Sequence, residues 1–178
     1  MTHNTEIETA RARTCEMLFN AGVALTLEER SRIEIVAFGL GELEKQGLQI
    51  VTYINNDRYC AKEIVLFPRQ TCPQHLHPPY GKDPGKMETF RCRWGKVFLY
   101  VEGQPSRSIN AFIPYRSEDF YTVFQEVVLE PGQQFTIPPS TLHWFQAGDR
   151  GAIVSEFSST SRDALDIFTD TRVVRVTQ

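Results

Sequence analysis

The chain has 178 residues, of which 41% are hydrophobic and 23% are charged, a balance typical of one folded soluble domain. Its net charge of -3 and pI of about 5.8 argue against nucleic acid as a partner, because phosphate binding needs a surplus of Lys and Arg. No apolar run reaches the roughly 18 residues of a membrane span, and the N-terminus has no apolar core of a secretory signal. We therefore expect a cytoplasmic protein with no membrane partner.

The four cysteines are scattered along the chain without any C-x-x-C spacing. This pattern favours reduced thiols over a disulfide scaffold or a thiolate zinc site. The four residues are Cys15, Cys60, Cys72 and Cys92.

Two amphipathic helices are predicted in the first quarter of the chain. Apolar residues recur every three or four positions over residues 5–21, and Gly22 follows as a stop signal. A second helix is predicted to begin after Thr26, because Thr-Leu-Glu-Glu fits a capping box, and to continue toward Gly47. We therefore expect residues 1–47 to form a helical hairpin.

After Gly47 the sequence consists of short β-rich segments separated by Pro, Gly, Asn and Asp, among them KVFLYV and AIVSEF. About eight such segments predict a mainly β sandwich or barrel instead of a parallel α/β sheet. We expect a single domain over residues 1–178, with a barrel at 48–178 and the helical hairpin packed on its outside. Exposed strand edges favour a homodimer, since two-fold pairing covers such edges.

Three of the four histidines lie in two Pro-rich motifs flanked by β segments. His75 and His77 are two residues apart on an extended segment, so their imidazoles point to the same side. Glu88 follows a Pro- and Gly-rich loop, and His143 follows the strand QFTI. A single histidine in such a place is more often a packed or surface residue, but three imidazoles and one carboxylate are a ligand set for one divalent ion. This set suits Mn²⁺, Fe²⁺, Co²⁺, Ni²⁺ or Zn²⁺, and the lack of thiolates argues against a closed structural zinc site.

These residues resemble the two motifs of the cupin superfamily. The first motif is His-x-His followed by Glu and, after six residues, Gly; here six residues separate Glu88 from Gly95. In the second motif five residues separate a Gly from a Pro, and a His follows; here five residues separate Gly132 from Pro138, and His143 follows.

The sequence departs from these motifs at three places. The loop before Glu88 is long, Ser140 replaces the second-motif Gly, and Ala147 replaces the Asn. The resemblance implies a cupin-type jelly-roll barrel. It also implies that one divalent ion is held by His75, His77, Glu88 and His143.

Within the cupins, five stretches resemble the D-lyxose isomerase family of aldose–ketose isomerases. They are HLH, KME, EPGQQFTIPPSTLHWF, IVSEFSST and SRDALDIFTDTRVVRV, and the resemblance covers the chain from residue 48 to its end. It implies an intramolecular oxidoreductase that interconverts D-lyxose and D-xylulose, and also D-mannose and D-fructose, with Mn²⁺ as the ion.

Aldose–ketose isomerisation moves a proton between C1 and C2, which requires a base near the carbon acid and an electrophile near the two oxygens. Glu156 lies on a strand of alternating pattern and is the leading candidate for the base. Lys86, two residues before Glu88, is the candidate to donate a proton or to hold a sugar hydroxyl. Lys62 and Asp166 are weaker candidates for binding sugar hydroxyls. The alternative interpretation of each of these four residues is an ordinary solvent-facing charge.

Two other functions remain open from the sequence. A cupin Fe(II) dioxygenase would use the same ligands, although an oxygenase pocket is usually more apolar than the charged residues near these motifs suggest. A non-catalytic sugar-binding cupin would bind the ligand without turnover.

Overall fold

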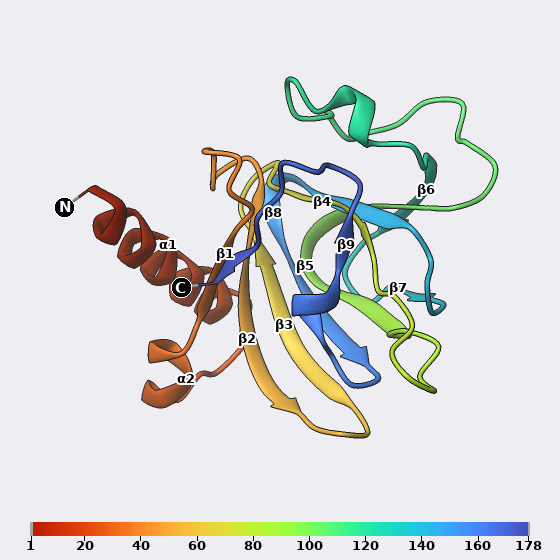
Figure 1. Cartoon of the computed structure of the whole chain (residues 1–178). Coiled ribbons are helices and arrows are strands. Elements are labelled where there is room, and N and C mark those ends of the chain that lie inside the picture. The colour runs from red at the N-terminus through yellow and green to blue at the C-terminus, as the bar shows by residue number, and fades with distance from the viewer. Residues whose placement is uncertain (1, 178) are drawn as a thin grey trace.

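The computed structural model describes residues 2–177, which form one curled antiparallel sheet of ten strands with a long helix packed against its outer face (Figure 1). None of the helices in this range is long and apolar enough to cross a membrane. The elements in chain order are α1 (Thr2–Asn20), α2 (Leu27–Ser31), β1 (Glu34–Ala37), β2 (Gly47–Asn55), β3 (Cys60–Leu66), β4 (Thr71–Leu76), β5 (Glu88–Val101), η1 (Glu118–Phe120), β6 (Gln125–Leu129), β7 (Gln134–Ile137), β8 (His143–Ser158), η2 (Asp163–Leu165), β9 (Ile167–Phe168) and β10 (Val176–Thr177).

The long strand β8 is the centre of the sheet. Its first part pairs with β4, its second part pairs with β3, and β5 runs along its other side over almost its whole length. The short strands β6 and β7 extend the sheet beyond β5. The first residue of β8 is His143, which is directly opposite His75 of β4, so this pairing brings the two histidine motifs together.

Gly95, the glycine of the first motif, lies in close contact with Gly151 of the paired strand β8. At Gly95 the pairing of β5 with β8 shifts register, and its φ of 76° lies in the left-handed region. A Cβ at this position would lie 2.1 Å from the carbonyl oxygen of Gly151. This distance is too short for any residue with a side chain, so the position requires glycine. The close approach allows both strands to bend together and curl the sheet.

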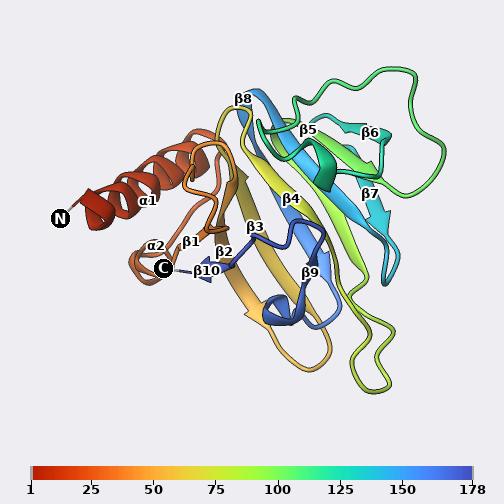
Figure 2. The ribbon, with the colours of Figure 1, turned by 45° about the horizontal axis from the view of Figure 1, so that its top comes forward.

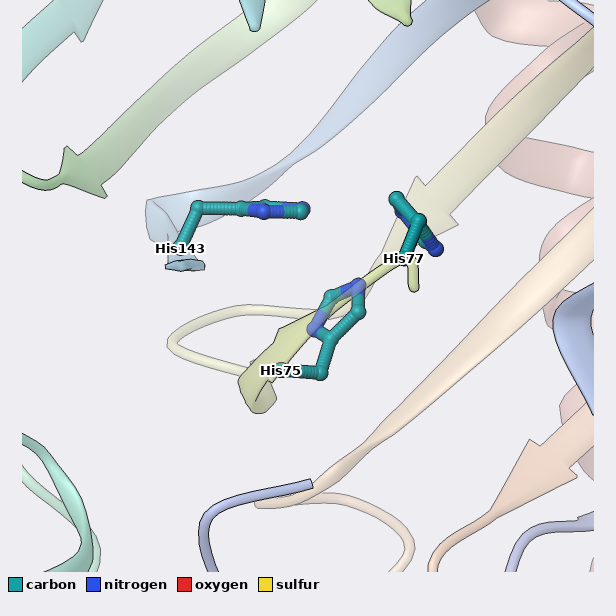
Figure 3. Close-up of side chains that lie close together, drawn as sticks. All are labelled: His75, His77 and His143. Atoms are coloured by element: carbon teal, nitrogen blue, oxygen red, sulfur yellow. The ribbon is translucent and has the colours of Figure 1, made fainter. Parts of the chain in front are cut away.

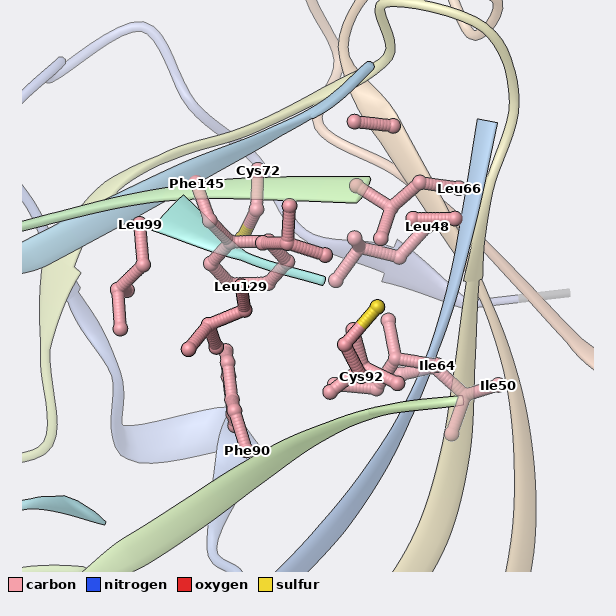
Figure 4. Close-up of a cluster of buried hydrophobic side chains, with 14 of the residues drawn as sticks. Leu48, Ile50, Ile64, Leu66, Cys72, Phe90, Cys92, Leu99, Leu129 and Phe145 are labelled. Atoms are coloured by element: carbon pink, nitrogen blue, oxygen red, sulfur yellow. The ribbon is translucent and has the colours of Figure 1, made fainter. Parts of the chain in front are cut away.

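Apolar side chains fill both faces of the sheet. Alternation along the strands sends one set into the barrel and the other set beneath α1. Figure 4 shows the inner cluster, whose labelled members are Leu48, Ile50, Ile64, Leu66, Cys72, Phe90, Cys92, Leu99, Leu129 and Phe145. The outer cluster includes Ile7, Ala10 and Leu18 of α1, so the amphipathic face predicted for the first helix is confirmed. The predicted mainly β fold class is confirmed as well.

The second helix is shorter than predicted. The capping box at Thr26 is present, but α2 ends at Ser31 and a strand, β1, follows at Glu34–Ala37. The physical reason is a period of two: Ile33 and Ile35 pack beneath α1, whereas Val36 and Phe38 face the barrel interior.

Two glycines further exclude a helix in this region. Gly39 and Gly41 have φ values of 71° and 79°, which are incompatible with a right-handed helix. The prediction that the second helix continues from Thr26 toward Gly47 is therefore wrong, and residues 1–47 do not form the expected hairpin of two long helices.

The C-terminal segment joins two edges of the sheet. Strand β9 pairs with β4 at one end of the strand order, and β10 pairs with β1 at the other end. Figure 2 shows this dark-blue segment crossing between the two edges. The backbone N–H of Val174 donates to the carbonyl of Phe38 at 3.0 Å and attaches the segment to the turn after β1. The C-terminal segment therefore helps to enclose one side of the barrel interior.

Candidate metal centre and active site

Three histidines converge at one end of the barrel interior. His75 is on β4, His77 follows directly after this strand, and His143 begins β8. One ring nitrogen from each lies within 4.8 Å of the other two, and Figure 3 shows the three imidazoles gathered around one region. All three side chains are buried. A buried group of this kind can hold a metal ion, which is the site that the motif spacing predicts.

Hydrogen bonds at the Nδ1 atoms orient the three rings. Nδ1 of His75 lies 2.8 Å from the carbonyl oxygen of Pro73, and Nδ1 of His143 lies 2.9 Å from that of Thr141. Nδ1 of His77 lies 2.5 Å from Oδ1 of Asp166. In each case Nδ1–H donates to an oxygen, so Nε2 is the nitrogen of each ring that can bind an ion. This arrangement is the usual one for metal-binding histidines. Burial lowers the pKa of His77, but the charge of Glu88 and the hydrogen bonds with Asp166 and Glu88 raise this pKa to about 9, so a metal ion would displace a proton from Nε2 of His77.

The carboxylate of Glu88 lies between the imidazoles. Its Oε1 atom is 3.2 Å from Nε2 of His77 and 3.0 Å from Nε2 of His143. Burial favours the neutral form of Glu88. However, the charge of Lys86 and the contacts between Glu88 and His77 lower the pKa of Glu88 well below the usual value. Glu88 is therefore an anion close to the imidazole nitrogens.

Within the histidine group, Nε2 of His143 has no hydrogen-bond partner in the part of the chain that the structure describes. Nε2 of His143 lies near Glu88 but is not aligned for a hydrogen bond with it. An unpartnered buried polar atom is costly unless a ligand satisfies it. Together with the set of three imidazole nitrogens and one carboxylate, this atom indicates that the residues fit a divalent first-row metal ion.

A chain of buried charges lies beside this group. Nζ of Lys86 is 2.7 Å from Oε2 of Glu88 and 3.1 Å from Oε1 of Glu156. Nζ of Lys62 is 3.8 Å from the same Oε1 atom of Glu156. The residues Glu156 and Val154 share the interior face of β8, with Val154 in the inner core. The structure therefore places Glu156, Lys86 and Lys62 together inside the barrel, and none of the three is an exposed charge.

The balance of burial and charge keeps Lys86 protonated. Burial alone would lower its pKa, but the carboxylates of Glu156, Glu88 and Asp163 outweigh burial and raise this pKa well above its usual value. The pocket therefore holds a buried ammonium group in direct contact with the carboxylate of Glu156.

Asp166 is engaged by two partners. One of its carboxylate oxygens contacts His77 and the other lies 3.2 Å from the guanidinium of Arg175. The position of Asp166 is therefore that of a residue that orients a histidine ring. Trp144 lies outside this pocket, in a separate cluster where it stacks on Tyr100.

The charged groups line one pocket whose other walls are apolar. The apolar side is provided by four phenylalanines and by aliphatic residues of β2 and β3: Phe38, Phe90, Phe145, Phe168, Leu48, Ile50 and Ile64. A pocket with apolar walls and a few convergent polar groups is typical of a small-molecule site.

Comparison with known proteins identifies the family. No family model matches the chain. The D-lyxose ketol-isomerase of Cohnella laeviribosi is 67% identical over 172 residues, which cover 97% of this chain and 94% of that protein. The chain belongs to the D-lyxose ketol-isomerase family. Other members include the D-lyxose ketol-isomerase of Thermofilum sp. (strain ex4484_79), 58% identical over 96% of this chain and 94% of that protein. The D-lyxose/D-mannose isomerase of Thermosediminibacter oceani is 55% identical over 99% of this chain and 97% of that protein.

Solved structures share the fold at much lower identity. The ligand-free L-ribose isomerase of Cellulomonas parahominis aligns with a TM-score of 0.79 at 16% identity, over 98% of this chain and 96% of that chain. The L-ribose isomerase of Acinetobacter sp. DL28 with L-ribose aligns with a TM-score of 0.75 at 16% identity, over 94% and 92%. These likenesses support the cupin-type barrel predicted from the motifs.

Two residues of this family member lie at the site although sequence reasoning did not single them out. Asp163 is 3.2 Å from Nζ of Lys62, and Arg175 is 3.0 Å from Asp163. Both come from the C-terminal segment, where the only signal is a concentration of charge in a stretch that also contains β-branched residues. Both residues are far from Lys62 in the sequence, so the sequence gives no sign that Asp163 contacts Lys62.

Proposed function

We propose that this protein is a metal-dependent aldose–ketose isomerase that interconverts D-lyxose and D-xylulose, and more slowly D-mannose and D-fructose. The observation that carries the proposal is the pocket in which His75, His77 and Glu88 lie together with the pair formed by Lys86 and Glu156. His143 completes the histidine group beside this pocket. The names of the family members support the choice of sugar.

The ion in this proposal is Mn²⁺, with Co²⁺, Ni²⁺, Fe²⁺ or Zn²⁺ as other metals of suitable ligand chemistry. The residues that would hold it are His75, His77, Glu88 and His143. When bound, the ion supplies a Lewis acid that draws electron density from the C1 and C2 oxygens of the sugar. Asp166 supports the site by holding the tautomer of His77.

Glu156 is the base in this proposal. It removes the proton from C2 of the aldose and returns a proton to C1, and the proton held by Glu156 between these two steps can exchange with solvent, while the C1 oxygen gains a proton and the C2 oxygen loses one. The ammonium of Lys86, 3.1 Å from Glu156, donates the proton to the C1 oxygen and receives the proton of the C2 hydroxyl. Lys62, whose Nζ is 3.8 Å from Glu156, contacts a further sugar hydroxyl. The result is a ketose with the atoms of the aldose conserved.

The apolar walls complete the site in this proposal. Phe38 and Phe168 cover the carbon skeleton of the sugar and reduce the access of water, which strengthens the interactions of the charged groups.

We also propose that the enzyme is a cytoplasmic homodimer. The four cysteines are free thiols, which suits a reducing compartment. Tyr53 and Phe157, half-exposed on β2 and β8, are apolar surface of the kind that a two-fold partner would cover. Sedimentation of the purified protein tests the dimer.

The activity test uses protein stripped of metal and reloaded with Mn²⁺, Co²⁺ or Ni²⁺. D-lyxose is supplied as the substrate and the ketose product is measured, with D-mannose in a parallel reaction. Folded protein that forms no ketose with any of the three metals would refute the proposal. Oxygen uptake with thiols or catechols would instead indicate a dioxygenase, and sugar binding without turnover would indicate a binding protein. Solvent tritium in the product supports proton transfer, because a hydride shift incorporates none.

A further inference from the structure

Arg175 links two acidic residues of the site from the C-terminal segment. It lies between β9 and β10, in the stretch that crosses between the two edges of the sheet (Figure 2). One guanidinium nitrogen is 3.0 Å from Oδ2 of Asp163, and another is 3.2 Å from Oδ2 of Asp166. The side chain of Arg175 is only 16% exposed. A planar guanidinium can contact two carboxylates at once, which the single ammonium of Lys cannot reproduce in the same geometry.

Each of these carboxylates holds a different part of the site. Asp166 uses its other oxygen to accept a hydrogen bond from His77. Asp163 accepts a hydrogen bond from Lys62 at 3.2 Å, and Lys62 faces Glu156. Arg175 therefore connects the histidine group to the lysine–glutamate group without touching either of them.

The same residues separate the pocket from an outer hollow. The pocket and the hollow share four lining residues, Asp163, Asp166, Phe168 and Arg175. This wall is the boundary between the buried site and the surface of the C-terminal segment. Loss of the guanidinium would leave two carboxylates side by side in this wall with less positive charge between them.

We infer that Arg175 is a positioning residue that acts on the site through Asp163 and Asp166. Without it, repulsion between the two carboxylates moves Asp166 away from His77 and leaves the ring of His77 free to change orientation or tautomer. Asp163 in turn shifts Lys62 away from Glu156. Changes to the partners of metal-binding histidines typically weaken metal affinity or activity by about 10- to 100-fold.

The inference rests on the proposed function for its catalytic part, and the test therefore includes a measurement that needs no sugar. The variants are Arg175→Gln, Arg175→Lys and the matched control Arg172→Gln. Arg172 is in the same segment, but it pairs with Asp170 and packs on Phe120 instead of lining the pocket. The dissociation constant for Mn²⁺ is measured from the electron paramagnetic resonance signal of the free ion. kcat and KM for D-lyxose are measured in parallel.

We expect Arg175→Gln to weaken Mn²⁺ binding about 10-fold and to lower kcat at least 10-fold, with KM changed less than threefold. Arg175→Lys should recover part of both losses, and Arg172→Gln should match the wild type. In an Asp166→Asn background, Arg175→Gln should weaken Mn²⁺ binding by less than threefold, because the residue through which it acts is already changed.

Three results would overturn the inference: Mn²⁺ affinity and kcat of Arg175→Gln within twofold of the wild type, equal losses in Arg172→Gln, or full additivity with Asp166→Asn. If Arg175→Gln fails to fold, Arg175→Lys decides, and wild-type values of its metal affinity and kcat count against the inference. Wild-type protein that binds Mn²⁺ but leaves D-lyxose unchanged would refute the proposed function alone, because the Mn²⁺ constants still test the role of Arg175.

Discussion

Replacement of Glu156 by Gln tests the assignment of the base most directly. Gln has nearly the same shape as Glu and retains an oxygen that can accept hydrogen bonds from Lys86 and Ser158, which lie 3.1 and 2.9 Å from the present carboxylate. It cannot accept a proton from carbon. The substitution therefore removes the proposed chemistry while it conserves the packing of the pocket.

The structure indicates how large the effect should be. The other carboxylates of the pocket are already engaged: Glu88 with the histidines and Lys86, Asp163 with Lys62, and Asp166 with His77. None of them is placed to replace Glu156. A positioned base contributes about 10²- to 10⁴-fold to the rate, so we expect kcat to fall about 10³-fold, or about 4 kcal/mol in the activation free energy.

Glu63 provides a matched control, because its strand pair with Ser155 is next to the pair of Lys62 with Glu156. Glu63 is also buried and lies next to Lys62 on β3, but alternation places it on the outer face of the sheet, where it accepts a hydrogen bond from Ser155 at 2.8 Å. Glu63→Gln removes one buried charge without affecting the pocket. We expect its kcat to stay within threefold of the wild type.

The assay follows ketose formation from D-lyxose at saturating Mn²⁺, together with exchange of the C2 proton with deuterated solvent by NMR. Glu156→Gln should lose both. Removal of a buried ion-pair partner also costs about 3–5 kcal/mol of stability, so thermal unfolding must show that each variant is folded at the assay temperature. A kcat of folded Glu156→Gln within tenfold of the wild type, or an equal loss in Glu63→Gln, would refute Glu156 as the base.

Three further predictions concern stability and metal. Gly95→Ala should destabilise the protein by more than about 3 kcal/mol, because the φ of 76° at this position is strained for Ala and the added Cβ would lie 2.1 Å from a backbone oxygen. Urea unfolding measures the loss of stability, and a loss below about 1 kcal/mol would contradict the prediction. Gln49→Met should stabilise the fold by about 1 kcal/mol, since neither amide atom of the buried Gln49 has a hydrogen-bond partner among the described residues; a lower melting temperature would count against this. Removal of metal by a chelator should abolish isomerisation and lower the melting temperature, and one equivalent of Mn²⁺ should restore both; metal-free protein with full activity would exclude a catalytic ion.

Local pattern was sufficient for the parts of this protein that depend on backbone period. The spacing of His75 and His77 by two residues on a strand places both rings on one side in any sheet, and the structure brings them within reach of His143. The helical period of residues 5–21 likewise predicted the buried face of α1. The motif glycine at Gly95 reflects a backbone conformation that only glycine adopts easily.

The same reasoning failed where two periods compete. Apolar residues between Ile33 and Leu43 fit a helix when they are counted at intervals of three and four. However, Ile35 and Val36 pack on opposite faces of a strand, which exists because β2 and β10 pair with it on both sides. A strand of four residues has little local preference of its own, so its partners determine its conformation.

The sequence by itself determined the histidine group, the strand-rich class of the fold and the set of candidate charges. Only the tertiary structure decided what those charges do. Asp166 contacts His77 and Lys86 contacts Glu156 across 89 and 70 residues of sequence, and Arg175 reaches the site because the C-terminal segment crosses between the two edges of the sheet. Which face of each strand becomes the interior depends on how the sheet closes. A pattern of alternating residues is the same for both faces, and therefore cannot specify which carboxylate will meet which ammonium inside the barrel.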